Sequence, residues 1–192
     1  MNHFPLFLNL NDKKVLIVGG GNIANRKLKY LLDFTSKTNT IIKLISKEFN
    51  SDILDTIKKN NLKIKTRDYK QKDIKKFDIV IVAINDKLLQ KDIFEESKKY
   101  GKCLVNSVDN KKYCDFILPS YTKTGDLTIA ISTNGTSPAF AKQFLEIIKR
   151  IIPNDIDKFL ENMNRLRYAM PKGKNRMNFF SKKVKKYINN SS

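Results

Sequence analysis

The stretch that decides the fold lies near the amino terminus and reads VLIVGGGNIANRK, residues 15–27. It opens with a short apolar, β-branched run, which is typical of a strand buried on both faces. Three glycines follow at once, and apolar residues then recur at helical spacing over residues 23–33. A buried strand that passes through glycines directly into a helix is the opening of a dinucleotide-binding βαβ unit.

The glycine motif is Gly19-x-Gly21-x-x-Ala24, and each position has a physical reason. The first glycine permits the tight turn, the second lets the backbone approach a pyrophosphate, and the small alanine lets the helix pack on the sheet. The free amides at the helix start, around Asn22 and Ile23, then face the phosphates. The alternative is a glycine turn without a ligand. The strand–helix context favours the dinucleotide, and we expect NAD as cofactor.

Two further positions are expected to contact the cofactor. The second strand, over residues 40–45, should end in an acid that binds the ribose, but Ser46 and Lys47 stand there instead. The choice between NAD and NADP therefore stays open, and Lys47 could accept a 2′-phosphate. The chain turns at Asn85, directly after the expected fourth strand, near the side where such folds place the nicotinamide. Asn85 and Asp86 could equally cap the helix that follows.

The rest of the chain alternates strands with helices as far as residue 108. Strands are expected over residues 62–66, 77–84 and 104–108, and helices over residues 49–60 and 87–100. This alternation predicts a Rossmann-like α/β fold with a parallel sheet. A hairpin of segments 115–120 and 127–132 and a helix over 139–152 follow, and residues 154–192 are expected to be helical and basic. We divide the chain into an NAD-binding domain (1–112), a dimerisation segment (113–152) and a basic helical region (153–192).

Composition limits the function further. The 192 residues carry a net charge of +19, and no apolar run approaches the ~20 residues of a membrane helix. We expect a cytoplasmic protein without a membrane partner. The 38 basic residues are 32 Lys and 6 Arg, which fits an AT-rich genome as well as a polyanionic ligand. Nucleic acid is not expected as a partner, because protein surfaces that bind it favour Arg and the sequence contains no recognisable helix-turn-helix.

Histidine and cysteine are too few for several kinds of site. His3 is the single histidine, and Cys103 and Cys114 are the two cysteines. Ser-His-Asp and Cys-His catalysis are therefore excluded unless the amino-terminal arm enters the site, and zinc-ligand spacing is absent. No metal site is expected. A carboxylate is then the plausible proton acceptor.

Four blocks of the sequence together resemble a known family. They are FPLF followed by VLIVGGGNIANRK, then AINDKLLQ (83–90), VNSVDNKKYCDFILPS (105–120) and LTIAISTNGTSPAFAK (127–142). In this order they resemble the precorrin-2 dehydrogenase / sirohydrochlorin ferrochelatase family, the N-terminal module of siroheme synthase. The resemblance covers about residues 3–152, and little carries over beyond residue 153.

The resemblance implies a function and a set of partners. Members oxidise precorrin-2 to sirohydrochlorin with NAD⁺, and in some the same site also inserts Fe²⁺ to give siroheme. Members are homodimers that exchange the segment after the nucleotide domain. The family's catalytic aspartate falls on Asp109, and Thr133 stands where relatives often carry serine. Whether this chain inserts iron stays open.

The residues themselves support these roles. Asp109 follows the fifth strand, at the edge where ligands of open parallel sheets bind. It could take a proton or orient the macrocycle, although it could also cap a turn. The loop before the Ser137-Pro138 helix start suits a carboxylate or a phosphate, so Thr133 and Ser137 are expected to bind substrate. The alternative is an ordinary capped helix start without a ligand. The alternative functions are a non-catalytic NAD-sensing module with a basic tail, and a ligand-free structural domain.

Overall fold

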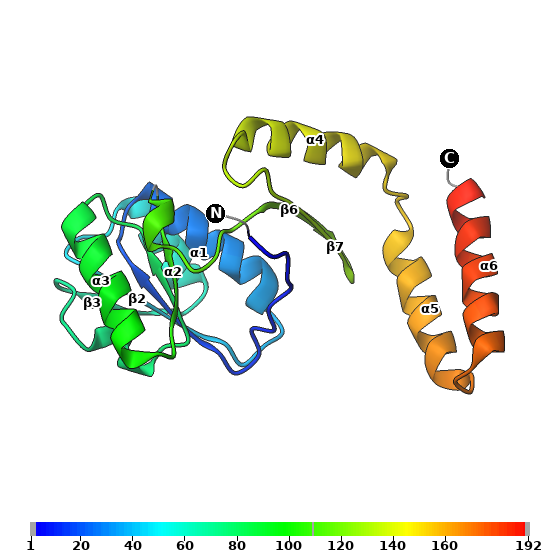
Figure 1. Ribbon diagram of the computed structural model, residues 1–192, viewed down its shortest axis with the longest axis horizontal. Coiled ribbons are helices and arrows are strands. Elements are labelled where there is room, and N and C mark those ends of the chain that lie inside the picture. The colour runs from blue at the N-terminus through cyan, green and yellow to red at the C-terminus, as the bar shows by residue number, and fades with distance from the viewer. Residues whose placement is uncertain (1–2, 109, 191–192) are drawn as a thin grey trace. The chain divides into compact units, whose positions relative to one another are not determined.

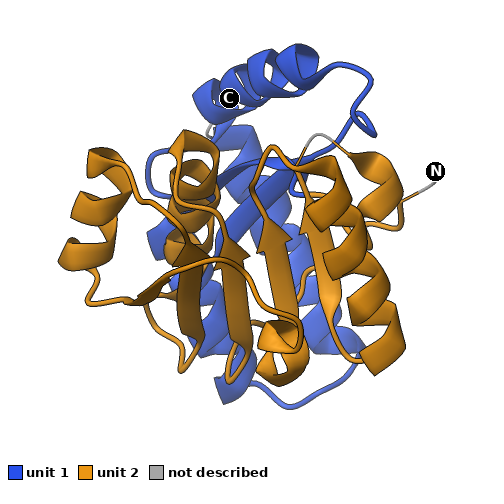
Figure 2. Cartoon of the chain, turned by 90° about the vertical axis from the view of Figure 1, so that its left-hand side faces the viewer, with its two compact units in different colours: residues 1–2, 118–192 blue, residues 3–117 orange. Residues whose placement is uncertain are grey.

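The computed structural model describes residues 3–108 and 110–190. They form two compact units, one within residues 3–117 and one within residues 118–190, which Figure 2 shows in orange and blue. Each unit is described by itself. The division into residues 1–112, 113–152 and 153–192 concerns function and stays a prediction.

The first unit is built on a five-stranded parallel sheet (Figure 1). Its strands are β1 (Lys14–Val18), β2 (Ile41–Ser46), β3 (Lys63–Thr66), β4 (Ile79–Val82) and β5 (Leu104–Ser107). Their order is β3-β2-β1-β4-β5, so the chain reverses direction across the sheet at β1 and β4. The carboxyl ends of these two strands are the switch point where such sheets bind ligands. The predicted Rossmann-like fold is confirmed.

Helices pack on both faces of this sheet. Helices α1 (Asn22–Thr35) and α2 (Ser51–Lys59) bury the side chains of Ala24, Leu28, Leu31, Ile53 and Ile57. On the other face, α3 (Lys87–Tyr100) and the 3-10 turn η1 (Asp73–Lys76) cover a core that includes Leu16, Val18, Val80, Val82 and Val105. Because neighbouring residues of a strand point to opposite faces, a strand between two helical layers is apolar throughout. Strand β4 is buried at every position, as expected.

The second unit opens with an antiparallel hairpin of β6 (Ser120–Thr124) and β7 (Leu127–Ile131). The predicted first strand over residues 115–120 is wrong, because strand β6 begins where that prediction ended. Asp115 is bonded to β5 instead of joining the hairpin, because its carboxylate accepts a hydrogen bond from the amide of Val105 at 2.9 Å. The pairing of Thr124 with Leu127 leaves a two-residue turn, and Gly125 takes its positive φ of 56°, which hairpin turns of this length require.

Helices complete the second unit. Helix α4 (Pro138–Ile151) packs against β6, and α5 (Ile156–Ala169) and α6 (Lys174–Asn190) follow. The predicted helical region after residue 153 is thus two helices, separated around Pro171 and Gly173, whose φ is 153°. The rings of Phe159 and Tyr187 stack with centroids 3.8 Å apart and join α5 to α6. Within the described residues, no helix combines the length and apolar character of a membrane span.

Candidate functional site

The glycine loop forms the centre of the candidate site, and its three glycines have different surroundings. Gly19 has a φ of 129°, and a Cβ there would lie 2.3 Å from the carbonyl oxygen of Ala83. A Cβ on Gly20 would lie 2.0 Å from the carbonyl oxygen of Glu48. A Cβ on Gly21 would meet no atom within 4 Å. The fold therefore needs the first two glycines, whereas the space beside the third belongs to no part of the described chain.

Helix α1 begins directly at this open space. Gly21 is its N-cap with extended backbone (φ −98°), no side chain caps it, and its first turn holds no acidic residue. The first amides of a helix have no partner inside the helix and carry partial positive charge. Among the described residues, the first hydrogen bond inside this helix runs from the amide of Asn25 to the carbonyl of Gly21 at 3.0 Å. An open glycine beside uncapped amides fits the pyrophosphate of a dinucleotide.

The predicted residues of the first helical turn divide into two groups. Asn22 and Ile23 are exposed, whereas Ala24 is fully buried against the sheet, in agreement with its packing role. The side-chain oxygen of Asn22 accepts from the side-chain amide of Asn50 at 2.5 Å. The backbone amide of Asn50 also donates to the carbonyl of Gly20 at 3.0 Å. Asn50, which we had not predicted for the site, thus joins the glycine loop to the start of α2.

Ser46 and Lys47 lie at the same edge of the sheet as the glycine loop. A Cβ on Gly20 would come within 2.9 Å of the Ser46 hydroxyl, so this hydroxyl borders the loop. The ammonium group of Lys47 forms an ion pair with Asp68, with 3.1 Å between Nζ and Oδ1. Asp68 comes from the segment after β3. The sequence carries no signal for its approach, because that approach depends on how β2 and β3 pair.

Asn85 lies exposed after β4, beyond Ala83, whose amide donates to Val18 at 2.8 Å. The cap of α3 is its neighbour Asp86, which accepts from the amides of Leu88 and Leu89, each at 3.0 Å. The backbone of β4 thus ends beside the glycine loop, and the capping role belongs to Asp86 rather than to Asn85.

The end of β5 carries several buried polar groups. Ser107 is 4% exposed, and its hydroxyl has no hydrogen-bond partner among the described residues. The thiol of Cys114 lies within hydrogen-bond distance of the carbonyl oxygens of Ser107 (3.1 Å) and Asn110 (3.3 Å), and burial raises its pKa. Asp109, the predicted catalytic residue, lies outside the described residues. It directly follows Val108, whose amide donates to the carbonyl of Val82 at 3.0 Å.

Asp115 has a structural environment. Its carboxylate accepts from the amide of Val105 and from the ammonium group of Lys98, and its own amide donates to the carbonyl of Val105 at 2.7 Å. These bonds tie the chain after β5 back onto that strand. Asp115 therefore has a structural role in the chain segment that follows Asp109 in the sequence.

Thr133 and Ser137 belong to the second unit, in the loop between β7 and α4. The hydroxyl of Ser137 caps α4 by accepting from the amide of Phe140 at 3.2 Å. The hydroxyl of Thr133 accepts from the amide of Ser137 at 3.1 Å. Each hydroxyl retains its own proton, which it can still donate to a ligand.

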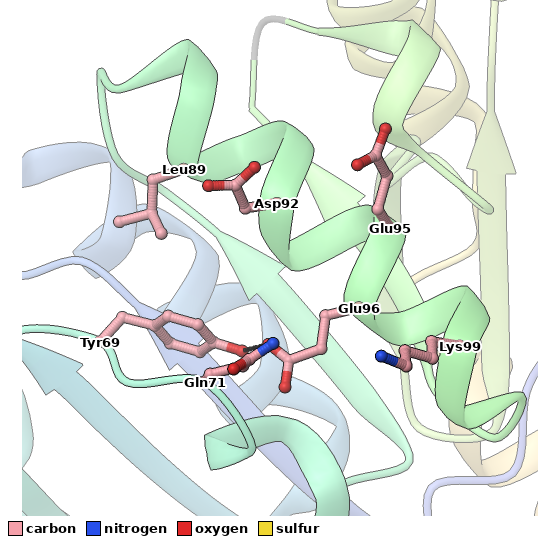
Figure 3. A pocket seen from close by; sticks show the side chains of 7 residues that line it. All are labelled: Tyr69, Gln71, Leu89, Asp92, Glu95, Glu96 and Lys99. Atoms are coloured by element: carbon pink, nitrogen blue, oxygen red, sulfur yellow. Dashed lines mark hydrogen bonds between the residues drawn. The ribbon is translucent and has the colours of Figure 1, made fainter.

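A pocket of about 430 Å³ lies elsewhere, on the face of the sheet that α3 covers (Figure 3). It is lined by Tyr69, Gln71, Leu89, Asp92, Glu95, Glu96 and Lys99. Glu96 accepts from the Tyr69 hydroxyl and from the amide of Lys72, each at 2.5 Å. Burial, with Glu96 beside it, raises the pKa of Tyr69. These bonds fasten the β3–β4 connection to α3, and the acidic lining does not suit a dinucleotide.

Two family models match the chain. One, described as putative NAD(P)-binding, matches residues 6–120, and the other, described as sirohaem biosynthesis protein central, matches residues 124–151. The first confirms the expected cofactor class on the unit that carries the glycine loop. Within residues 3–108 and 110–190, no three His, Cys, Asp or Glu side chains gather as a metal site would require.

Curated relatives and a solved structure resemble the chain over most of its length. "Siroheme synthase" of Neisseria meningitidis serogroup C is 29% identical over 88% of this chain and 34% of the relative. "Siroheme synthase" of Buchnera aphidicola is 31% identical over 90% of this chain and 35% of the relative. The chain thus spans about a third of the length of these relatives. The structure of "SirC, precorrin-2 dehydrogenase" has a TM-score of 0.76 at 23% identity, covering 95% of this chain and 89% of that one, and shows the shared fold.

Proposed function

The chain belongs to the family of the NAD(P)-binding module of siroheme synthases, and from this premise we propose that it oxidises precorrin-2 to sirohydrochlorin with NAD⁺. The observation that carries the proposal is the glycine loop. Gly21 opens onto free space beside the uncapped amides of α1, and the matched family model covers this unit. The relatives are named siroheme synthases, and this name indicates a tetrapyrrole as the class of substrate.

In the proposed reaction, precorrin-2 loses two electrons and two protons. NAD⁺, when bound, supplies the acceptor for the hydride, which accounts for both electrons and one proton. The second proton leaves to a base, and we assign this role to Asp109, which comes two residues after the last residue of β5 in the sequence. The chain's other contribution is to hold the reactants. The glycine loop and the first amides of α1 bind the pyrophosphate. At the same edge of the sheet, Ser46 ends β2, Lys47 follows it, and Asn85 comes after β4.

The proposed substrate accounts for the basic charge of the chain. Precorrin-2 carries eight carboxylates, and a chain of net charge +19 attracts such a polyanion and raises its rate of encounter. We assign substrate carboxylates to the loop that holds Thr133 and Ser137, where two hydroxyl donors precede the start of α4.

The test is an anaerobic assay. The protein is incubated with precorrin-2 and NAD⁺, and the spectrum of sirohydrochlorin is followed together with the absorbance of NADH. We expect one NADH for each sirohydrochlorin formed. Adding Fe²⁺ afterwards tests the iron insertion that some family members perform, with Fe²⁺ as substrate. No NADH from a protein that binds NAD⁺ would refute the dehydrogenase and leave the NAD-sensing module as the function.

We also propose that the protein is a homodimer, with the second unit supplying the interface. Along α4, the side chains of Phe140, Phe144, Ile147 and Ile151 are 58%, 43%, 55% and 71% exposed. Their spacing places them along one side of the helix, and Phe140 and Phe144 stack with centroids 5.6 Å apart. An exposed apolar stripe of this kind is typical of a protein–protein interface.

We expect light scattering at micromolar concentration to give the mass of a dimer, and Phe144→Glu to give a monomer, because a charge would then be buried in the interface. The control is Gln143→Glu, which adds the same charge at the neighbouring exposed position of α4. A wild-type monomer, or a dimer that Phe144→Glu leaves intact, would contradict the assignment.

A further inference from the structure

We propose that Asp68 replaces the acid that is missing at the end of β2, and that it makes the site select NAD⁺ over NADP⁺. In dinucleotide-binding sheets that acid accepts hydrogen bonds from the adenine ribose. Here Ser46 and Lys47 occupy its place. The proposal rests on the proposed function only in that the glycine loop binds a dinucleotide.

The pairing of two strands brings Asp68 to this corner. Strands β2 and β3 are parallel, with Ser46 opposite Thr66, so their carboxyl ends meet at the edge that holds the glycine loop. The amide of Arg67 donates to the carbonyl of Ser46 at 2.9 Å and continues the pairing by one residue. The next residue is Asp68, and its carboxylate reaches the ammonium group of Lys47 at 3.1 Å. An acid that follows β3 thus stands beside the position that β2 leaves without one.

The backbone at Asp68 is held in place by its neighbours. The guanidinium of Arg67 donates to both carboxylate oxygens of Asp73, each at 2.7 Å, and also to the carbonyl of Asp68 at 2.7 Å. Asp73 in turn accepts from the amide of Lys70 at 2.8 Å. The Arg67 guanidinium holds the pKa of Asp73 below its usual range, so the Arg67–Asp73 ion pair stays charged at neutral pH. This closed loop fixes the point from which the Asp68 side chain extends.

The charges at the corner favour a ribose with a free 2′-hydroxyl. A 2′-phosphate needs a cation, but Lys47 and Arg67 are already paired with Asp68 and Asp73. The phosphate would also come close to the Asp68 carboxylate, which repels it. A hydroxyl, by contrast, can donate to that carboxylate. The ion pair is mostly exposed and adds little to stability, so Asp68 can be changed without loss of the fold.

The experiment compares the affinity of NAD⁺ and NADP⁺ by calorimetry, so its readout does not depend on turnover. The proteins are the wild type, Asp68→Asn and Glu48→Gln. Glu48 is an exposed acid two residues after β2, and its substitution removes the same charge from the same region. We expect the wild type to prefer NAD⁺ by at least about tenfold, the typical effect of a hydrogen bond to a charged group. In Asp68→Asn this preference should fall by about tenfold, through weaker NAD⁺ and tighter NADP⁺ binding.

Three results would overturn the inference. A wild type that binds NADP⁺ as tightly as NAD⁺ would show no selection, and a ratio that Asp68→Asn leaves unchanged would show that Asp68 does not select. An equal change in Glu48→Gln would assign the effect to general charge. Each of these leaves the proposed function standing. Binding of neither dinucleotide to the wild type would instead refute the glycine-loop site, and with it both proposals.

Discussion

Gly21→Asp should abolish NAD⁺ binding while leaving the protein at least as stable as the wild type. The new carboxylate would occupy the open space beside the amides of α1, where the pyrophosphate binds in our proposal. Two like charges about 4 Å apart repel by about 4 kcal/mol at a protein surface, and about 2.8 kcal/mol already weakens binding a hundredfold. We therefore expect at least a hundredfold loss of affinity by calorimetry.

The same substitution should not harm the fold. Gly21 is the N-cap of α1 with extended backbone, and aspartate is among the preferred N-cap residues, better than glycine by roughly a few tenths of a kcal/mol. The matched control is Gly19→Ala, whose positive φ and contact with Ala83 predict a lower melting temperature. Unchanged NAD⁺ affinity in folded Gly21→Asp protein would show that the dinucleotide site lies elsewhere.

Asp109→Ala should lose at least about a hundredfold in kcat while NAD⁺ binding survives. General acid–base groups typically contribute ~10²–10⁴-fold, and the sequence offers a single histidine, His3, as an alternative proton acceptor. The measurement is kcat per folded molecule in the anaerobic assay, beside a melting curve. Loss of turnover at an unchanged melting temperature is the expected result.

Asp115→Asn provides the contrast to this variant. The Asp115 carboxylate holds the amide of Val105 and the ammonium group of Lys98, so its loss should lower the melting temperature and leave kcat of the folded fraction nearly normal. If Asp109→Ala instead behaves in this way, the catalytic assignment is wrong and Asp109 is a turn residue.

Much of the first unit was predictable because its signals are local. The apolar run before the glycines, the all-apolar β4 and the periodicity of α3 each lie within a few residues of sequence, and each appears in the fold as expected. The hairpin was placed less well. Residues 115–120 are apolar enough for a strand, but the bonds of Asp115 to Val105 join positions ten residues apart, which no periodicity reveals.

The candidate site likewise contains residues whose place follows from local sequence and residues whose place depends on distant contacts. The roles of Gly19 and Ala24 follow from their spacing, and the structure gives both the surroundings that were expected. Asn50 and Asp68 were missed because they reach the glycine loop and Lys47 through the pairing of distant segments. The contacts of all the predicted residues with cofactor or substrate stay predictions, as does the catalytic role of Asp109.

The thiol of Cys114 gives the loop from Asn110 to Cys114 a natural chemical reporter. The thiolate is the form that reacts with alkylating reagents, and burial raises the pKa of Cys114, so the folded protein should be modified slowly. Because the same thiol lies against the carbonyl groups of Ser107 and Asn110, any ligand that tightens or opens this loop changes the modification rate. Cys103, whose pKa burial raises to about 12, serves as the internal reference. Ligand binding can thus be followed in the native protein without an added label.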